Sequence, residues 1–68
     1  MRSYTPKEIV TILLSQGFVF LTSKGSHHLY INRETGNRTI VPMHGKDLKK
    51  GILHAILKQA GIDPLELD

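Results

Sequence analysis

The first feature of the chain is a set of apolar residues at helical spacing. The stripe comprises Ile9, Val10, Ile12, Leu13 and Leu14. Residues 5–8 (TPKE) precede it with a threonine suited to an N-cap, a proline in the first turn and a glutamate three residues after the cap, which together form a capping box. Gly17 supplies the left-handed residue that commonly ends a helix. The pattern predicts a helix over about residues 6–16.

Three β-prone runs follow, each too short for a helix and each bounded by turn residues. They are residues 18–22 (FVFLT), 27–32 (HHLYIN) and 38–42 (RTIVP). Lys24 and Gly25 form the first turn, and Gly36 and Asn37 carry the turn chemistry of the second. Three strands joined by two short turns predict an antiparallel meander.

A second amphipathic pattern begins after Asp47, which we interpret as an N-cap, and ends at Gly61. Its apolar stripe comprises Leu48, Ile52, Leu53, Ile56, Leu57 and Ala60. Ile62 is placed for the hydrophobic contact that accompanies a Schellman cap. Asp63 and Pro64 then resemble a cap and a first helical residue, so one further turn is expected.

The order of these elements, α-β-β-β-α, predicts an α+β fold. Three antiparallel strands need one face covered, and the two helices have the apolar stripes to cover it. We therefore expect a three-stranded antiparallel sheet with two helices on one face, which is the arrangement of a double-stranded-RNA-binding domain. At 68 residues the chain is expected to form a single domain over residues 1–68.

The composition changes this picture in two ways. The absence of cysteine excludes disulfides and thiolate zinc sites and is typical of a reducing compartment. The opening residues lack the apolar core of a signal peptide, and no apolar run approaches the length needed to cross a bilayer. We expect a soluble, cytoplasmic protein with no membrane partner.

The charge distribution points to a polyanionic partner. The net charge is +3, but between Ile9 and Ile62 seven basic residues face only two acids. An excess of this kind is expected of a domain that meets a phosphate backbone. A lysine-rich surface that serves only solubility remains the alternative.

The adjacent histidines at the start of the second predicted strand are the first candidates for chemistry. Because successive strand residues point to opposite faces, His27 and His28 are expected on different sides of the sheet. That geometry argues against both of them holding one metal ion. His44 and His54 are the only other histidines, and no carboxylate cluster lies near by in the sequence, so neither a metal site nor a cofactor is expected.

Proton transfer is the more natural role for one of these histidines, because imidazole titrates near neutral pH. RNA carries its own nucleophile, the 2′-hydroxyl, so a metal-free ribonuclease needs little beyond proton transfer and cations that stabilise the charge developing at phosphorus. Lys24 adjoins the pair, and His44 and Lys46 lie in a loop that can hold a phosphate before the second helix. The alternative is a histidine that only satisfies the turn or lies in solvent.

Four segments taken together resemble the HicA family of bacterial and archaeal toxins. They are the first helix ending in QGF, the turn GSHH, the loop VPMHGK and the final helix LKKGILHAILKQAGI. The resemblance spans nearly the whole chain. It implies an mRNA endoribonuclease with a double-stranded-RNA-binding-like fold, and a HicB-like antitoxin as protein partner.

The resemblance also implies site residues. The family's essential histidine follows the Gly-Ser turn, which matches His27 by position, with His28 as the second choice. Gly25 and Ser26 match the turn that positions the histidine. Lys24, His44 and Lys46 are our candidates for phosphate contacts, on their charge and placement alone.

Two other functions are compatible with the same residues. A non-catalytic RNA-binding module would use the basic surface without cleaving RNA. A protein that only binds an acidic partner would not bind RNA even at low salt.

Overall fold

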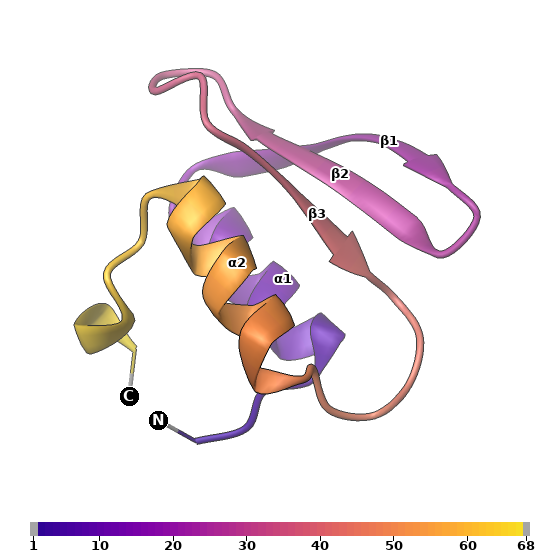
Figure 1. Cartoon of the computed structure of the whole chain (residues 1–68). Coiled ribbons are helices and arrows are strands. Elements are labelled where there is room, and N and C mark those ends of the chain that lie inside the picture. Colours follow the sequence, from indigo (N-terminus) through magenta and orange to yellow (C-terminus); the bar gives the residue numbers. More distant parts are fainter. Residues whose placement is uncertain (1, 68) are drawn as a thin grey trace.

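Two helices and a three-stranded antiparallel sheet make up the chain in the order predicted from its sequence (Figure 1). The structure, a computed structural model, describes residues 2–67. The elements are α1 (Pro6–Ser15), β1 (Phe18–Lys24), β2 (His27–Asn32), β3 (Arg38–Pro42), α2 (Lys50–Ala60) and a short 3-10 helix, η1 (Pro64–Glu66). The predicted α+β fold is confirmed.

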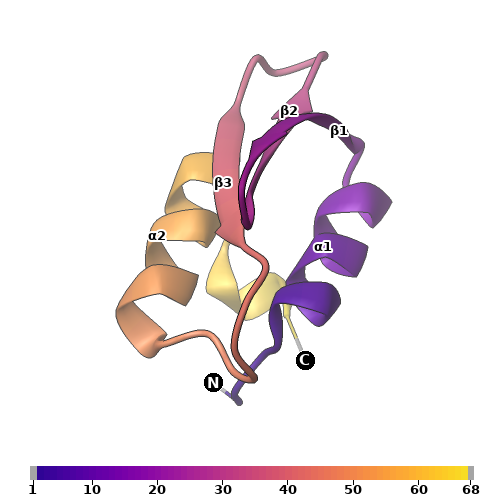
Figure 2. The ribbon, with the colours of Figure 1, turned by 90° about the vertical axis from the view of Figure 1, so that its right-hand side faces the viewer.

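The sheet has the order β1-β2-β3 and buries one of its faces. Register pairs Tyr30 of β2 with Thr39 of β3, and both side chains are buried on the face that the helices cover. Helix α2 packs against β3, and α1 packs mainly against β1 (Figure 1, Figure 2). In Figure 2, α2 lies at the left beside β3 and α1 lies at the right near β1.

The core fills the space between the helices and the covered face. Its buried apolar residues are Tyr4, Ile9, Leu13, Phe18, Tyr30, Val41, Leu48, Leu53, Ile56, Leu57, Ala60 and Ile62. No helix among residues 2–67 packs on the opposite face, which we call the open face. There Val19 and Ile40 keep 40% and 51% of their surface exposed. An aliphatic surface of this kind, left in water, is a feature that a binding partner can cover.

The start of α2 differs from the prediction. Asp47 is not the N-cap; Lys49 occupies that position, and no side chain caps the helix. The reason lies in Leu48, which is buried and whose backbone N–H donates to Tyr4 O at 2.8 Å. This bond holds the chain outside the helix for two residues beyond Asp47. Ile52, predicted as a core residue, is 41% exposed, because it lies at the edge of the buried stripe.

The end of β1 and the turn after it also differ slightly from the prediction. β1 continues two residues beyond the predicted Thr22, to Lys24, with a register shift between Phe20 and Thr22. The first turn is therefore formed by Gly25 and Ser26 rather than by Lys24 and Gly25. At the other end of the chain, the expected cap and turn are confirmed, since Asp63 Oδ1 accepts a hydrogen bond from Leu65 N at 2.9 Å.

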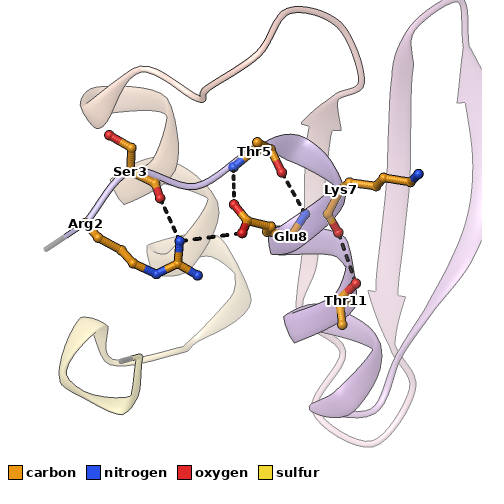
Figure 3. Close-up of polar contacts among 6 residues, drawn as sticks. All are labelled: Arg2, Ser3, Thr5, Lys7, Glu8 and Thr11. Carbon is orange, nitrogen blue, oxygen red and sulfur yellow. Dashed lines mark hydrogen bonds and ion pairs between the residues drawn. The ribbon is translucent and has the colours of Figure 1, made fainter.

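The predicted capping box is present at the start of α1 (Figure 3). Glu8 N donates to Thr5 Oγ1 at 3.2 Å, and Glu8 Oε1 accepts from Thr5 N at 2.9 Å. Arg2 also approaches the Glu8 carboxylate, at 3.5 Å. The pKa of Glu8 is lowered, first by the hydrogen bond from the Thr5 backbone and then by the charge of Arg2.

This lowered pKa makes the box sensitive to acid. A carboxylate whose pKa is lower in the folded state stabilises that state above its ordinary pKa of 4.5 and loses the effect as pH falls through the folded-state value. Glu8→Gln should therefore melt below the wild-type protein at pH 7, and the gap should close as pH drops below 4.5. Thermal unfolding by circular dichroism from pH 7 to pH 3 measures this, and a gap that stays constant would contradict it.

Candidate active site

The turn between β1 and β2 sets the position of His27. Lys24, the last residue of β1, pairs with His27, the first residue of β2, so two residues close the hairpin. Gly25 has φ of +59°, in the left-handed region that glycine tolerates without strain. The length of this turn therefore determines the register with which β2 begins.

The two adjacent histidines lie on opposite faces of the sheet, as predicted. His27 pairs with Pro42 of β3 and has an exposed side chain on the open face. His28 pairs with Val41, which is fully buried, so its half-buried ring lies on the covered side. There the ring of Phe20 meets it edge-on at a centroid distance of 5.4 Å. Of the two adjacent rings, that of His27 is the more exposed.

A shallow hollow surrounds His27 on the open face. We call it the open-face hollow; its lining residues are Thr22, Ser23, Lys24, His27, Leu29 and Ile40. Lys24 supplies a cation, and Leu29 and Ile40 supply an aliphatic floor. A cation beside an exposed imidazole suits the binding of a phosphate and the transfer of a proton near it.

The loop after β3 brings His44 next to His27. Met43 N donates to Ser26 O at 2.7 Å, so the pairing of β2 and β3 extends by one backbone bond beyond the ladder. The rings of His27 and His44 lie 6.1 Å apart, centroid to centroid, at an interplanar angle of 82°. Two imidazoles from residues 17 positions apart in the sequence therefore lie next to each other.

The remaining candidates lie in different places. Ser26 is half-buried and contributes its backbone carbonyl, while Gly25 is exposed at the tip of the turn. Lys46 is exposed, but it lines a separate hollow beside Lys7 and the N-terminus of α1. The structure therefore places Lys24 and His27 in one hollow and the ring of His44 beside that of His27, whereas Lys46 lines a different hollow.

Several residues near the site were not identified from the sequence. Leu29 and Ile40 line the open-face hollow, and Lys49 lines a neighbouring hollow with His44. Strand alternation predicts that Leu29 lies on the same face as His27, because it follows His27 by two residues. Ile40 and Lys49 carry no such signal, since their positions depend on the register of β3 and on the course of the loop.

The fold and the site define a small α+β protein in which two exposed histidines, His27 and His44, lie next to each other and a lysine lines the hollow of His27. Comparison with protein families places it more closely: the model of the HicA toxin family, described as the HicA toxin of bacterial toxin-antitoxin systems, matches residues 6–62. The chain belongs to this family and is thus the toxin component of a toxin–antitoxin system. A search of curated protein sequences found no match.

Two further observations concern the described part of the chain. Within residues 2–67, neither helix is long and apolar enough to span a membrane. Nor does this part of the chain gather three or more histidine, aspartate or glutamate side chains in a geometry that could hold a metal ion.

Proposed function

We propose that this toxin is a metal-independent endoribonuclease that cleaves mRNA in the cytoplasm by histidine acid/base catalysis and is neutralised by a HicB-like antitoxin. The chain belongs to the HicA family, and this family is known as a family of mRNA interferases. The observation that carries the proposal is the exposed ring of His27 in the open-face hollow, with Lys24 lining the same hollow.

The proposed chemistry uses the RNA's own nucleophile. His27 exchanges a proton with the sugar–phosphate backbone while the ammonium of Lys24 offsets the negative charge that develops on the phosphate oxygens. The Gly25–Ser26 turn holds the histidine at the end of β2, and its backbone lies beside the approaching phosphate. Lys46, in its separate hollow, would contact a phosphate further along the RNA chain. His28 serves packing against Phe20.

Incubation of the purified chain with RNA, with and without EDTA, tests this proposal. We expect cleavage products in both conditions, and at the same rate. Cleavage that requires an added divalent cation would contradict the metal-independent mechanism. Salt-sensitive RNA binding with no products after long incubation would instead support the second candidate, a non-catalytic RNA-binding module that uses the same cationic residues.

The open face is the surface that we assign to the antitoxin. Val19 and Ile40 leave aliphatic area exposed there, while Lys24 and Arg38 supply cations near its two ends. Phe20 and Tyr30 pair on the other side, so the side chains around His27 on the open face are mainly aliphatic and cationic. A second copy of the chain would bring like charges together. An antitoxin with apolar and acidic side chains would complement both the aliphatic area and the positive charge of the face. Its binding would cover His27.

A charge placed on this face should weaken antitoxin binding. Ile40→Glu is expected to reduce the affinity for the antitoxin by about 10- to 100-fold, as central interface residues do when they are lost. Leu14→Glu, on α1, is the matched control, because Leu14 is 52% exposed and Ile40 is 51% exposed. Titration calorimetry measures both affinities. Equal losses in the two variants, or none in Ile40→Glu, would contradict this assignment.

A further inference from the structure

The geometry points to His44 as the second proton-transfer group of RNA cleavage, acting with His27 on opposite sides of one phosphodiester. This inference rests on the proposed ribonuclease function and adds to it the group that the sequence alone does not identify. Its basis is the placement of His44 relative to His27, which follows from the sheet.

Strand register places the two rings on the same face. His27 lies across from Pro42 in the β2–β3 ladder. His44 follows Pro42 by two residues, in the loop just beyond β3, and its ring lies beside that of His27 on this face. The hydrogen bond from Met43 N to Ser26 O keeps the loop paired with the turn at this point. His44 therefore occupies the place beside His27 that a diagonal cross-strand neighbour would take if β3 were longer.

The separation of the rings suits a shared substrate. Their centroids are 6.1 Å apart and both side chains are exposed. Among residues 2–67 neither imidazole has a hydrogen-bond partner, so both can donate or accept. A proton-transfer group must come within about 2.6–3.2 Å of the atom that it serves. A phosphodiester held between the rings brings its attacking and leaving oxygens within reach of one imidazole each.

The resulting step balances without a further reactant. One imidazole removes the proton of the 2′-hydroxyl as the 2′-oxygen forms a bond to phosphorus. The other, protonated, donates its proton to the 5′-oxygen as the bond between phosphorus and that oxygen breaks. The products are a 2′,3′-cyclic phosphate and a free 5′-hydroxyl. One imidazole gains the proton that the other loses, so the protein ends the step with unchanged net charge.

The charged groups around the two rings come from two elements. Lys24, at the end of β1, pairs with His27 and lines its hollow. Asp47 and Lys49, in the segment between β3 and α2, line the hollow that holds His44. The other two histidines lie elsewhere, His28 on the covered side of the sheet and His54 on the exposed surface of α2. His44 is thus the one histidine among residues 2–67 whose ring is paired with that of His27.

The test compares His44→Gln with His54→Gln, an exposed histidine outside the site, and with His27→Gln. Circular dichroism first establishes that each variant is folded. On RNA, His44→Gln should lose about 10²- to 10⁴-fold in cleavage rate, the usual contribution of a proton-transfer group, while His54→Gln cleaves as the wild-type protein does. The bell-shaped dependence of the wild-type rate on pH should lose one of its limbs in His44→Gln.

A modified substrate separates proton transfer from mere positioning. In it, sulfur replaces the bridging 5′-oxygen at a cleavage site mapped with the wild-type protein. A thiolate leaves without protonation, because thiols are much stronger acids than alcohols. We expect this substrate to restore the rate of one of the two variants, His27→Gln or His44→Gln, which identifies the proton donor. Rescue of neither or of both would overturn the inference.

The outcomes also separate this inference from the proposed function. If His27→Gln is inactive while His44→Gln keeps the wild-type rate and pH profile, the ribonuclease proposal stands and the role of His44 is wrong. If the wild-type chain does not cleave RNA, or His27→Gln cleaves as well as wild type, the proposed function itself fails.

Discussion

Replacing His27 with alanine is expected to abolish RNA cleavage while leaving the fold unchanged. The ring is exposed on the open face, so its removal leaves no cavity in the core and no buried group without a partner. Loss of a proton-transfer group lowers a rate by about 10²–10⁴-fold. Gel analysis of RNA cleavage and growth arrest on induction in cells both measure the effect.

His28→Ala is the matched control for this prediction. It removes the same side chain one residue away, but on the covered side of the sheet. We expect cleavage near the wild-type rate and a stability loss of about 0.5–1.5 kcal/mol from the missing edge-to-face contact with Phe20. The reverse result, an inactive His28→Ala and an active His27→Ala, would show that the site lies on the other face of β2.

Gly61→Ala is expected to destabilise the protein substantially, by about 2 kcal/mol or more. Gly61 ends α2 with φ of +73°, a left-handed conformation that costs an L-residue about 1–2 kcal/mol. A Cβ there would also lie 2.7 Å from Asn37 Nδ2. Asn37 would have to move, which breaks its hydrogen bond to Ala60 O at 3.2 Å. Strain and the lost bond thus act together.

Gly51→Ala provides the opposite case within the same helix. Gly51 has helical dihedral angles, and a Cβ there would meet nothing within 4 Å. Alanine is favoured over glycine in a helix by up to about 1 kcal/mol, so this variant should be more stable than wild type. Urea unfolding of the two variants measures the difference. A stabilised Gly61→Ala, or two variants with equal midpoints, would contradict the assignment of the helix end.

The parts of the fold that could be predicted are those with short-range causes. The capping box at Thr5 and Glu8, and the end of α2 at Gly61 with Ile62 packed behind it, each depend on residues within a few positions of one another. Strand alternation likewise placed His27 and His28 on opposite faces from two adjacent letters of the sequence. Such features need no knowledge of the rest of the chain.

The parts that could not be predicted depend on contacts between distant segments. Asp47 has the composition of a cap, but the hydrogen bond from Leu48 to Tyr4 delays the helix. The proximity of His44 to His27 likewise follows from the pairing of Met43 with Ser26. The sequence pattern identified both histidines as candidates, whereas only the structure shows that their rings are neighbours.

The two-residue turn at Gly25 and Ser26 has a consequence for how this toxin can change. A slip of one residue in the pairing of β2 exchanges the two faces of the strand, so His27 would turn toward the helices and His28 toward the substrate. An insertion or deletion at the hairpin tip that shifts this register would therefore change which of the two imidazoles lies on the open face, which a substitution in the turn would not do. The doubled histidine would keep an imidazole on the open face after such a slip, but the slip would also turn the buried side chains of Tyr30 and Asn32 toward solvent.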